Sequence, residues 1–439
     1  MASQGTVLAH NLGEHYELPL PLTLFVVGGA AVVLLSFLLV IRLRGEPAPV
    51  VDAPDTVPTR SFSVVPGTLS LLFLAVLVYL GFAGTQEPSE SLSTVAFWVV
   101  LWIAVPLLCG LVGDVTRAVN PFANAARLLD SPKLRKAVLA RKKPLTYRSG
   151  WWPALVLFVL LVLGELVFNS ETGSIKPAFV ATVLLLYTVL SGFLGLVYGS
   201  AWLERGEVFS VLWNTWGRQG YFRFGAPGRR GFAGGLDVPF ERGPSRVLLV
   251  LLLLISINFD GLLATPYWVK HIASDKYASG TELQEVGILV ALAVVVLAVF
   301  TGFAVASARS GRHGSTPLGA LAGLLPSLVP IAYGYLVAHN LSYLAIETKT
   351  LFGSLLQHPL NGNASYRVDV NLVPSSVQWY VGLGVIVAVH VIAVVLAHRH
   401  LSRTAEDERS ALRSEYPWLV AMVAYTAFSL YLIAQPVAA

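Results

Sequence analysis

The chain has 439 residues, of which 55% are hydrophobic and only 13% are charged. A soluble protein normally has about 25% charged residues, so this composition excludes an ordinary soluble globular protein and indicates a polytopic membrane protein. The net charge of +5 comes from basic residues that we expect beside anionic lipid headgroups, so it does not indicate nucleic-acid binding.

Ten apolar stretches follow one another along the chain, and each is long enough, or nearly so, to cross a hydrocarbon core of about 30 Å as a helix. They predict an all-α fold, a polytopic bundle of about ten transmembrane helices in a single transmembrane domain over residues 1–439. The first twenty residues lack the basic and apolar regions of a cleavable signal peptide, so we expect the first stretch to remain as an anchor. The stretches are 21–41, 64–83, 92–112, 151–168, 178–200, 247–264, 286–308, 318–338, 377–397 and 418–435.

Lysine and arginine are unevenly distributed between these stretches. The segments after the first, third, fifth, seventh and ninth stretches contain 25 of the 30 basic residues, and the opposite segments contain five. Because cytoplasmic loops carry an excess of basic residues, this bias predicts that both termini lie outside the cytoplasm. An even number of spans also places both termini on one face. We expect a multi-pass protein of the cell inner (cytoplasmic) membrane.

Two long basic segments, 113–150 and 201–246, lie on the predicted cytoplasmic side. The first interleaves basic residues with leucines over Ala123–Lys143, and the second has aromatic residues at helical spacing. Both patterns predict helices that lie at the membrane interface. The alternative for the first segment is a recognition surface for an acidic partner, and for the second it is a cofactor-binding motif. The aromatic residues of the second segment are Trp202, Phe209, Trp213 and Trp216.

Of the two long outer segments, 265–285 and 340–376, the second is the longer. It contains turn-forming residues, among them Pro359, Gly362 and Pro374. Long loops on a rigid scaffold often carry function, so we predict a long outer loop there.

Three acidic residues lie within or at the end of predicted spans, where a charge costs about 2.5–3.5 kcal/mol on insertion scales. Asp114 ends the third span, and we expect it to pair with Arg117 one turn later. Glu165 and Asp260 lie in the fourth and sixth spans, which both run outwards, so we expect them at similar depth in the outer part of the membrane. We predict that they face the protein interior near each other as candidate catalytic residues. Snorkelling to the outer surface is the alternative.

Histidine is also concentrated towards the outer side. Five of the nine histidines lie there, including His10 and His339, and His390 lies inside the ninth span. Imidazole and carboxylate ligands suit zinc, copper or a di-metal site, so we predict metal ligation by His10, His339 and His390. The spacing matches no local metal motif, and an ordinary interfacial role for each histidine is the alternative. His390 needs a hydrogen-bond partner because it lies in mid-span.

Six strings in the chain are distinctive: HNLGEHYELPLP from His10, NPF from Asn120, GELV from Gly164, WLERGEVFS from Trp202, NFDGLLATPYW from Asn258 and VHVIAVVLAH from Val389. Together they resemble a bacterial family of integral membrane proteins, common in actinobacteria, that is labelled fenitrothion hydrolase. The chain departs from the family pattern at Asn11 and His15, where the pattern has glycine and arginine, so His15 is not an expected ligand. His10, Glu165, Asp260, His339 and His390 sit where the chain follows the pattern.

The resemblance implies a metal-dependent hydrolase of lipophilic organophosphate triesters, with a site on the outer side of the bilayer. In that scheme His10 and His339 bind the metal, Asp260 bridges it or acts as a base, and Glu165 orients a ligand or relays protons. A metal lowers the pKa of bound water to about 7, which makes hydroxide available.

Two alternatives remain open. One is a secondary transporter with a five-plus-five inverted repeat, because Gly28-Gly29 and Asn258 to Gly261 interrupt the first span of each half. The other is a non-catalytic, metal-binding membrane subunit of a larger complex.

Overall fold

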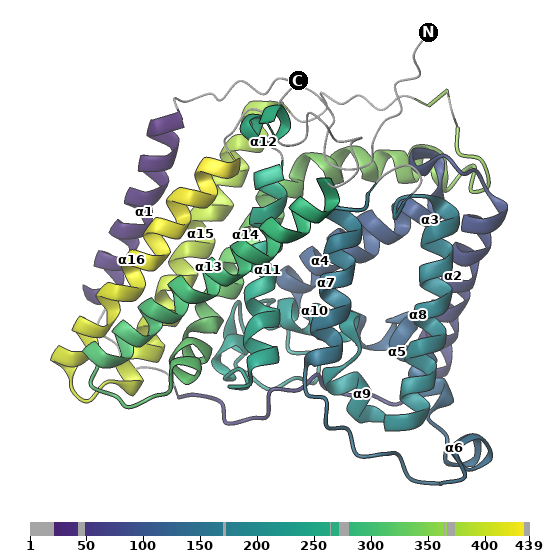
Figure 1. The fold of residues 1–439 in the computed structure, drawn as a ribbon, viewed down its shortest axis with the longest axis horizontal. Coiled ribbons are helices and arrows are strands. Elements are labelled where there is room, and N and C mark those ends of the chain that lie inside the picture. Colours follow the sequence, from purple (N-terminus) through teal and green to yellow (C-terminus); the bar gives the residue numbers. More distant parts are fainter. Residues whose placement is uncertain are drawn as a thin grey trace. The chain divides into compact units, whose positions relative to one another are not determined.

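The computed structural model describes residues 22–42, 49–169, 173–263, 265–271, 281–363, 365–366 and 374–433. The regular structure in these ranges is helical, with no strand (Figure 1). Seven helical segments in the described chain are long and apolar enough to cross a membrane. The predicted helical fold is therefore confirmed, and the seven segments support a multi-pass membrane protein. The seven segments are Val64–Ala83, Leu92–Val112, Pro177–Tyr198, Pro244–Leu263, Glu282–Ser310, Pro317–Leu355 and Ser376–Thr404.

Each of the ten predicted spans coincides with helical structure. Three predicted spans are not among the seven long segments. Two of these three spans contain the shorter apolar segments Val26–Phe37 and Trp152–Leu166. The third lies in the helix Glu408–Ile433, which contains Pro417. The count of ten spans and the position of the termini stay predictions. The helices are α1 (Leu22–Arg42), α2 (Val64–Ala83), α3 (Leu92–Val95) continued by a π-helix (Ala96–Ala104) and α4 (Val105–Val112), α7 (Trp152–Leu166), α8 (Pro177–Tyr198), α11 (Pro244–Leu263), α13 (Thr281–Ser310), α14 (Pro317–Thr350), α15 (Ser375–Thr404) and α16 (Glu408–Ile433).

The chain divides into two compact units, and the single transmembrane domain stays a prediction. Unit 1 contains the described residues of 56–235 and 342–372, and unit 2 those of 11–55, 236–341 and 373–439. In unit 1, α8 packs against α2 and against α5 (Pro121–Leu129). In unit 2, α1, α13 and α15 all pack against α16 (Figure 1). The division does not separate the first five spans from the last five, because α1 belongs to unit 2.

The glycines in α1 and the polar residues in α11 do not break their helices. α1 is continuous through Gly28 and Gly29, and α11 is continuous through Asn258 and Gly261. A side chain at Gly29 would meet Leu430 of α16, so this glycine permits close helix packing. The helix breaks expected of an inverted-repeat transporter are therefore missing from both described helices.

The second basic segment is more buried than we expected. It forms α9 (Ser200–Arg205) and α10 (Val208–Gly217), and every residue of α10 is buried in unit 1. α10 packs against α4 and α7. The aromatic spacing reflected a helix inside the protein, where we had expected one at the membrane interface.

Only part of the first basic segment, 113–150, is exposed. The first six residues of α5 are buried. In α6 (Pro132–Leu139), Lys133 and Lys136 are exposed, whereas Arg135 is buried and donates to the Leu196 and Lys142 carbonyls. The buried arginine fastens the exposed basic turn to the end of α8.

The predicted outer loop begins later than expected. α14 continues to Thr350, and a π-helix follows over Leu351–Leu355. No glycine or proline lies between His339 and Gly353, so nothing in the sequence ends the helix earlier.

The predicted topology is testable by cysteine labelling in a Cys109→Ser background. Cysteines introduced at positions 5 and 437 should react with an impermeant maleimide in intact cells, because both termini are expected outside. A cysteine introduced at position 140 should react only after permeabilisation. Reaction at position 5 only after permeabilisation would show that the orientation is reversed.

The packing of α8 on α5 makes Gly195 sensitive to substitution. An added Cβ would lie 2.6 Å from the Cα of Ala126, so the backbones must separate. We expect Gly195→Ala to lower the free energy of unfolding by about 1–3 kcal/mol, as overpacking does. Gly287→Ala in α13 is the matched control, because nothing lies within 4 Å of its added Cβ. Equal melting temperatures of the two variants in detergent would refute this account.

Candidate functional site

Two of the predicted site residues meet in unit 2. Asp260 lies near the end of α11 and His339 in the second half of α14. The Nε2 atom of His339 lies 2.6 Å from Oδ2 of Asp260, and their side chains are 17% and 14% exposed. The two groups form an ion pair when the imidazole is protonated. No local motif could predict this pair, because 79 positions separate the two residues.

This contact is too short for the two side chains to bind one metal ion together through these atoms. Two ligands at about 2.0–2.1 Å from a tetrahedral zinc ion lie about 3.3 Å apart, which exceeds the observed 2.6 Å. Within the described ranges, no group of three histidine, cysteine or acidic residues is placed to hold a metal. His10, the third predicted ligand of this site, lies outside the described residues. The predicted metal site therefore stays a prediction.

Asn258, two residues before Asp260, fixes this end of α11 to α16. Its side-chain amide donates to the Leu254 carbonyl at 2.8 Å and contacts the Tyr425 hydroxyl. The Ser429 hydroxyl donates to Oδ1 of Asn258 at 2.8 Å. Because a buried, satisfied polar group is costly to displace, these bonds hold the turn that carries Asp260 in place.

His390 occupies a different position, buried between α15 and α16. Its Nδ1 lies 2.7 Å from the Ile386 carbonyl oxygen, and its Nε2 lies 2.7 Å from the Thr426 hydroxyl. The side chain has no exposed surface. The partner that a mid-span imidazole needs is thus supplied by a neighbouring helix. Both ring nitrogens therefore have hydrogen-bond partners, and metal ligation by His390 stays a prediction.

Glu165 lies in α7 and is half-buried in unit 1. Its carboxylate and that of Glu347 both act electrostatically on the Tyr343 hydroxyl. Tyr343 and Glu347 are four residues apart in α14 and so share one face of that helix. Asp260 belongs to unit 2, and the predicted proximity of Glu165 and Asp260 stays a prediction.

Glu207, which the sequence analysis did not single out, organises the interior of unit 1. This fully buried carboxylate caps α10 by accepting from the backbone of Phe209 and Ser210. It also accepts from the Asn120 amide at 2.8 Å and the Tyr187 hydroxyl at 2.6 Å. Two strings that carry the family resemblance, NPF and WLERGEVFS, therefore meet here. Their role in this structure is to hold α5, α8 and α10 together.

Asp114 also differs from expectation. Its carboxylate caps the short helix Val115–Ala118 by accepting from the Thr116 backbone and hydroxyl. Arg117, its expected salt-bridge partner, instead donates to the Pro58 carbonyl. Burial raises the pKa of Asp114, and the hydrogen bonds from Thr116 and Asn214 and the charge of Arg117 oppose that shift.

Comparisons with known proteins found no match to this chain. No family model, no curated protein and no solved structure matches this chain. The fenitrothion hydrolase label therefore remains a resemblance carried by the six strings.

Proposed function

We propose that this protein is a membrane-embedded hydrolase of an uncharged, lipophilic ester, in which Asp260 and His339 handle the proton of the attacking water. The 2.6 Å contact between carboxylate and imidazole carries this proposal. An ionisable residue within an apolar helix is costly, and such residues usually mark functional sites. A carboxylate that orients an imidazole is also a recurring acid–base arrangement.

The reaction requires only water and an aryl phosphotriester, the substrate class that the family resemblance suggests. A water oxygen attacks phosphorus, and the Asp260–His339 pair accepts one water proton. The bond between phosphorus and the aryl oxygen then breaks. The aryloxide leaves, and the proton held by the pair returns to it or to the medium. The products are a phosphodiester and a phenol.

The location of the pair suits a substrate that dissolves in the bilayer. Asp260 lies in a predicted span, and both side chains are partly exposed. An uncharged triester concentrates in the hydrocarbon phase by the hydrophobic effect, so it would reach this position without crossing water.

A transition metal at His10 and His339 is a separate part of the proposal. It would supply a bound hydroxide near neutral pH. Elemental analysis of the purified wild type beside His10→Ala and His339→Ala tests it. We expect zinc or copper in the wild type and less in both variants. A wild type without a transition metal, or variants that retain the metal fully, would refute this part of the proposal. The Asp260–His339 pair would then be the only base at the site.

The proposed activity is tested by reconstituting the purified protein into liposomes with a lipophilic nitrophenyl phosphotriester. We expect release of nitrophenolate well above that of protein-free liposomes. A charged, water-soluble phosphodiester should not be hydrolysed, because it does not enter the bilayer. Equal rates with and without protein would contradict the proposed function.

A further inference from the structure

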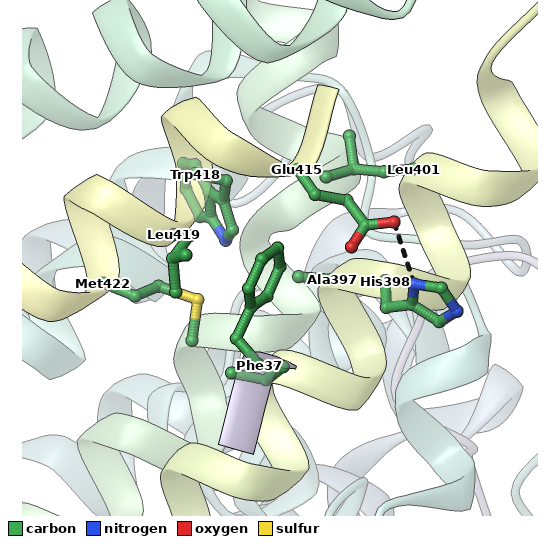
Figure 2. Close-up of a pocket in the computed structure, with 9 residues that line it drawn as sticks. Phe37, Ala397, His398, Leu401, Glu415, Trp418, Leu419 and Met422 are labelled. Carbon is green, nitrogen blue, oxygen red and sulfur yellow. Dashed lines mark hydrogen bonds and ion pairs between the residues drawn. The ribbon is translucent and has the colours of Figure 1, made fainter. Parts of the chain in front are cut away.

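A small pocket between α1, α15 and α16 of unit 2 has room for about one water molecule (Figure 2). In it, Nδ1 of His398 lies 2.9 Å from Oε1 of Glu415. The buried Oε2 of Glu415 has no hydrogen-bond partner among the described residues. A single water molecule would satisfy that oxygen, so this pocket does not indicate a ligand site.

A cluster of exposed aromatic side chains in unit 1 indicates a contact surface. It lies in the segment that follows α10, residues 219–235, which we call the aromatic loop. Tyr221, Phe222 and Phe224 are 54%, 51% and 42% exposed, and Phe232 is 40% exposed. The ring centroids of Tyr221 and Phe222 are 5.1 Å apart, and those of Phe222 and Phe224 are 5.8 Å apart. An exposed apolar cluster of this kind marks a contact with a membrane or with another protein.

Hydrogen bonds within the aromatic loop hold these rings at the surface. The Arg223 guanidinium donates to the carbonyls of Gly220 and Gly231. The backbone amide of Gly231 donates in turn to the Tyr221 carbonyl at 3.2 Å. The rings are therefore carried by an ordered turn, which keeps them exposed.

The attachment of the aromatic loop to α4 indicates which contact it makes. The backbone amide of Tyr221 donates to the Leu111 carbonyl at 3.1 Å. That of Phe222 donates to the Val112 carbonyl at 2.7 Å. Val112 ends the segment Leu92–Val112, which is long and apolar enough to cross a membrane, and Leu111 is 57% exposed on it. The exposed apolar surface of this segment thus continues into the aromatic cluster, and aromatic rings at the end of a span are typical of the headgroup region.

The charge of the aromatic loop indicates the kind of lipid. The loop contains three arginines and no acidic residue. One of them, Arg230, is exposed and directly precedes Gly231, whose backbone is bonded to Tyr221. Arginines beside interfacial aromatic rings favour anionic headgroups, whose phosphates accept hydrogen bonds from guanidinium groups. An acidic protein could also pair with the arginines, but a lipid accounts in addition for the position of the rings at the end of a span.

We propose that the aromatic loop binds anionic phospholipid at the membrane surface beside α4. Tyr221, Phe222 and Phe224 lie at the boundary between headgroups and acyl chains, and Arg230 lies against a headgroup phosphate. The interfacial contact that we expected of the aromatic row in α10 is thereby assigned to the loop that follows it. This surface is independent of the Asp260–His339 pair and of the proposed hydrolysis.

Spin-label accessibility tests the position of the loop in the full-length protein. Labels are attached to Phe222→Cys and Phe224→Cys, each in a Cys109→Ser background, in vesicles of equal parts phosphatidylglycerol and phosphatidylcholine. The ratio of collisions with oxygen to collisions with an aqueous nickel chelate should be several-fold higher at both positions than at Glu408→Cys, because oxygen dissolves in the bilayer. Glu408 is the control, since it is exposed beside two other acidic residues. A ratio equal to that of the control, or protection from both reagents by a second copy of the chain, would overturn the proposal.

A bimane fluorophore on Phe222→Cys shows which lipid touches the loop. Brominated phosphatidylglycerol should quench it at least twofold more than brominated phosphatidylcholine at the same mole fraction. Arg230→Gln should reduce this preference, because it removes the charge beside the rings. Arg312→Gln, which changes an exposed arginine of unit 2, should keep it. Equal quenching by the two lipids when Arg230 is present would overturn the assignment to anionic lipid.

Discussion

Asp260→Asn is expected to lower kcat for a lipophilic aryl phosphotriester by about 10²–10⁴-fold, the range typical of a positioned general base. Asparagine keeps the size of the side chain but cannot accept and hold the water proton. His339→Gln should have a similar effect, because the imidazole and the carboxylate form one unit at 2.6 Å. Nitrophenolate release by each variant in liposomes, at matched protein content, is the measurement.

The double variant Asp260→Asn/His339→Gln distinguishes a working pair from two independent contributions. Groups that act as a unit show strongly non-additive losses. We therefore expect the kcat of the double variant to be at most a few-fold lower than that of either single variant. Glu282→Gln, an exposed carboxylate in α13, is the control and should retain wild-type turnover. Fully additive losses would show that the two side chains act separately.

Arg246→Ala is expected to lower the free energy of unfolding by about 3–5 kcal/mol, the cost typical of breaking a buried ion pair from one side. Nε and Nη2 of Arg246 lie 3.0 Å and 3.2 Å from the two carboxylate oxygens of Asp55. Both side chains are almost fully buried, at 1% and 3% exposure. Asp55 also accepts from the Glu241 backbone, so the pair fastens the segment after α1 to the start of α11.

Denaturation in a mild detergent measures this loss, with Arg312→Ala as the matched control. Arg312 lies 3.7 Å from Glu406, but both side chains are more than 60% exposed. An exposed pair contributes only about 0–1 kcal/mol. The double variant Asp55→Ala/Arg246→Ala should be less destabilised than the sum of its single variants, since neither charge is then left alone. Equal destabilisation by Arg246→Ala and Arg312→Ala would contradict the assignment.

Hydropathy was sufficient to predict the long helices, because a helix that crosses the bilayer needs about 20 predominantly apolar residues. It failed for α10. A row such as Phe209, Trp213 and Trp216 has the same spacing whether it faces a membrane surface or a protein interior, and here it is buried. The burial of α10 depends on Glu207, whose buried carboxylate accepts hydrogen bonds from residues of α5 and α8. No local sequence pattern predicts such contacts.

The candidate site was predictable in its residue types but not in its partners. The cost of a charge in a span singled out Asp260, and the outer position singled out His339. Their contact depends on how α11 and α14 pack. The need of His390 for a hydrogen bond was predictable, whereas Thr426 as its partner was not. The burial of Glu415 was not predicted, because this residue lies just before the apolar stretch of α16, in a predicted cytoplasmic loop.

The most direct test of the proposed hydrolysis is turnover of a lipophilic aryl phosphotriester in ¹⁸O-labelled water, with the wild type and Asp260→Asn compared in liposomes. The proposal predicts that the wild type releases the phenol and places one ¹⁸O atom on the phosphodiester product. Asp260→Asn should do so at no more than about one-hundredth of that rate. Wild-type turnover equal to that of protein-free liposomes, or ¹⁸O found in the phenol, would contradict it.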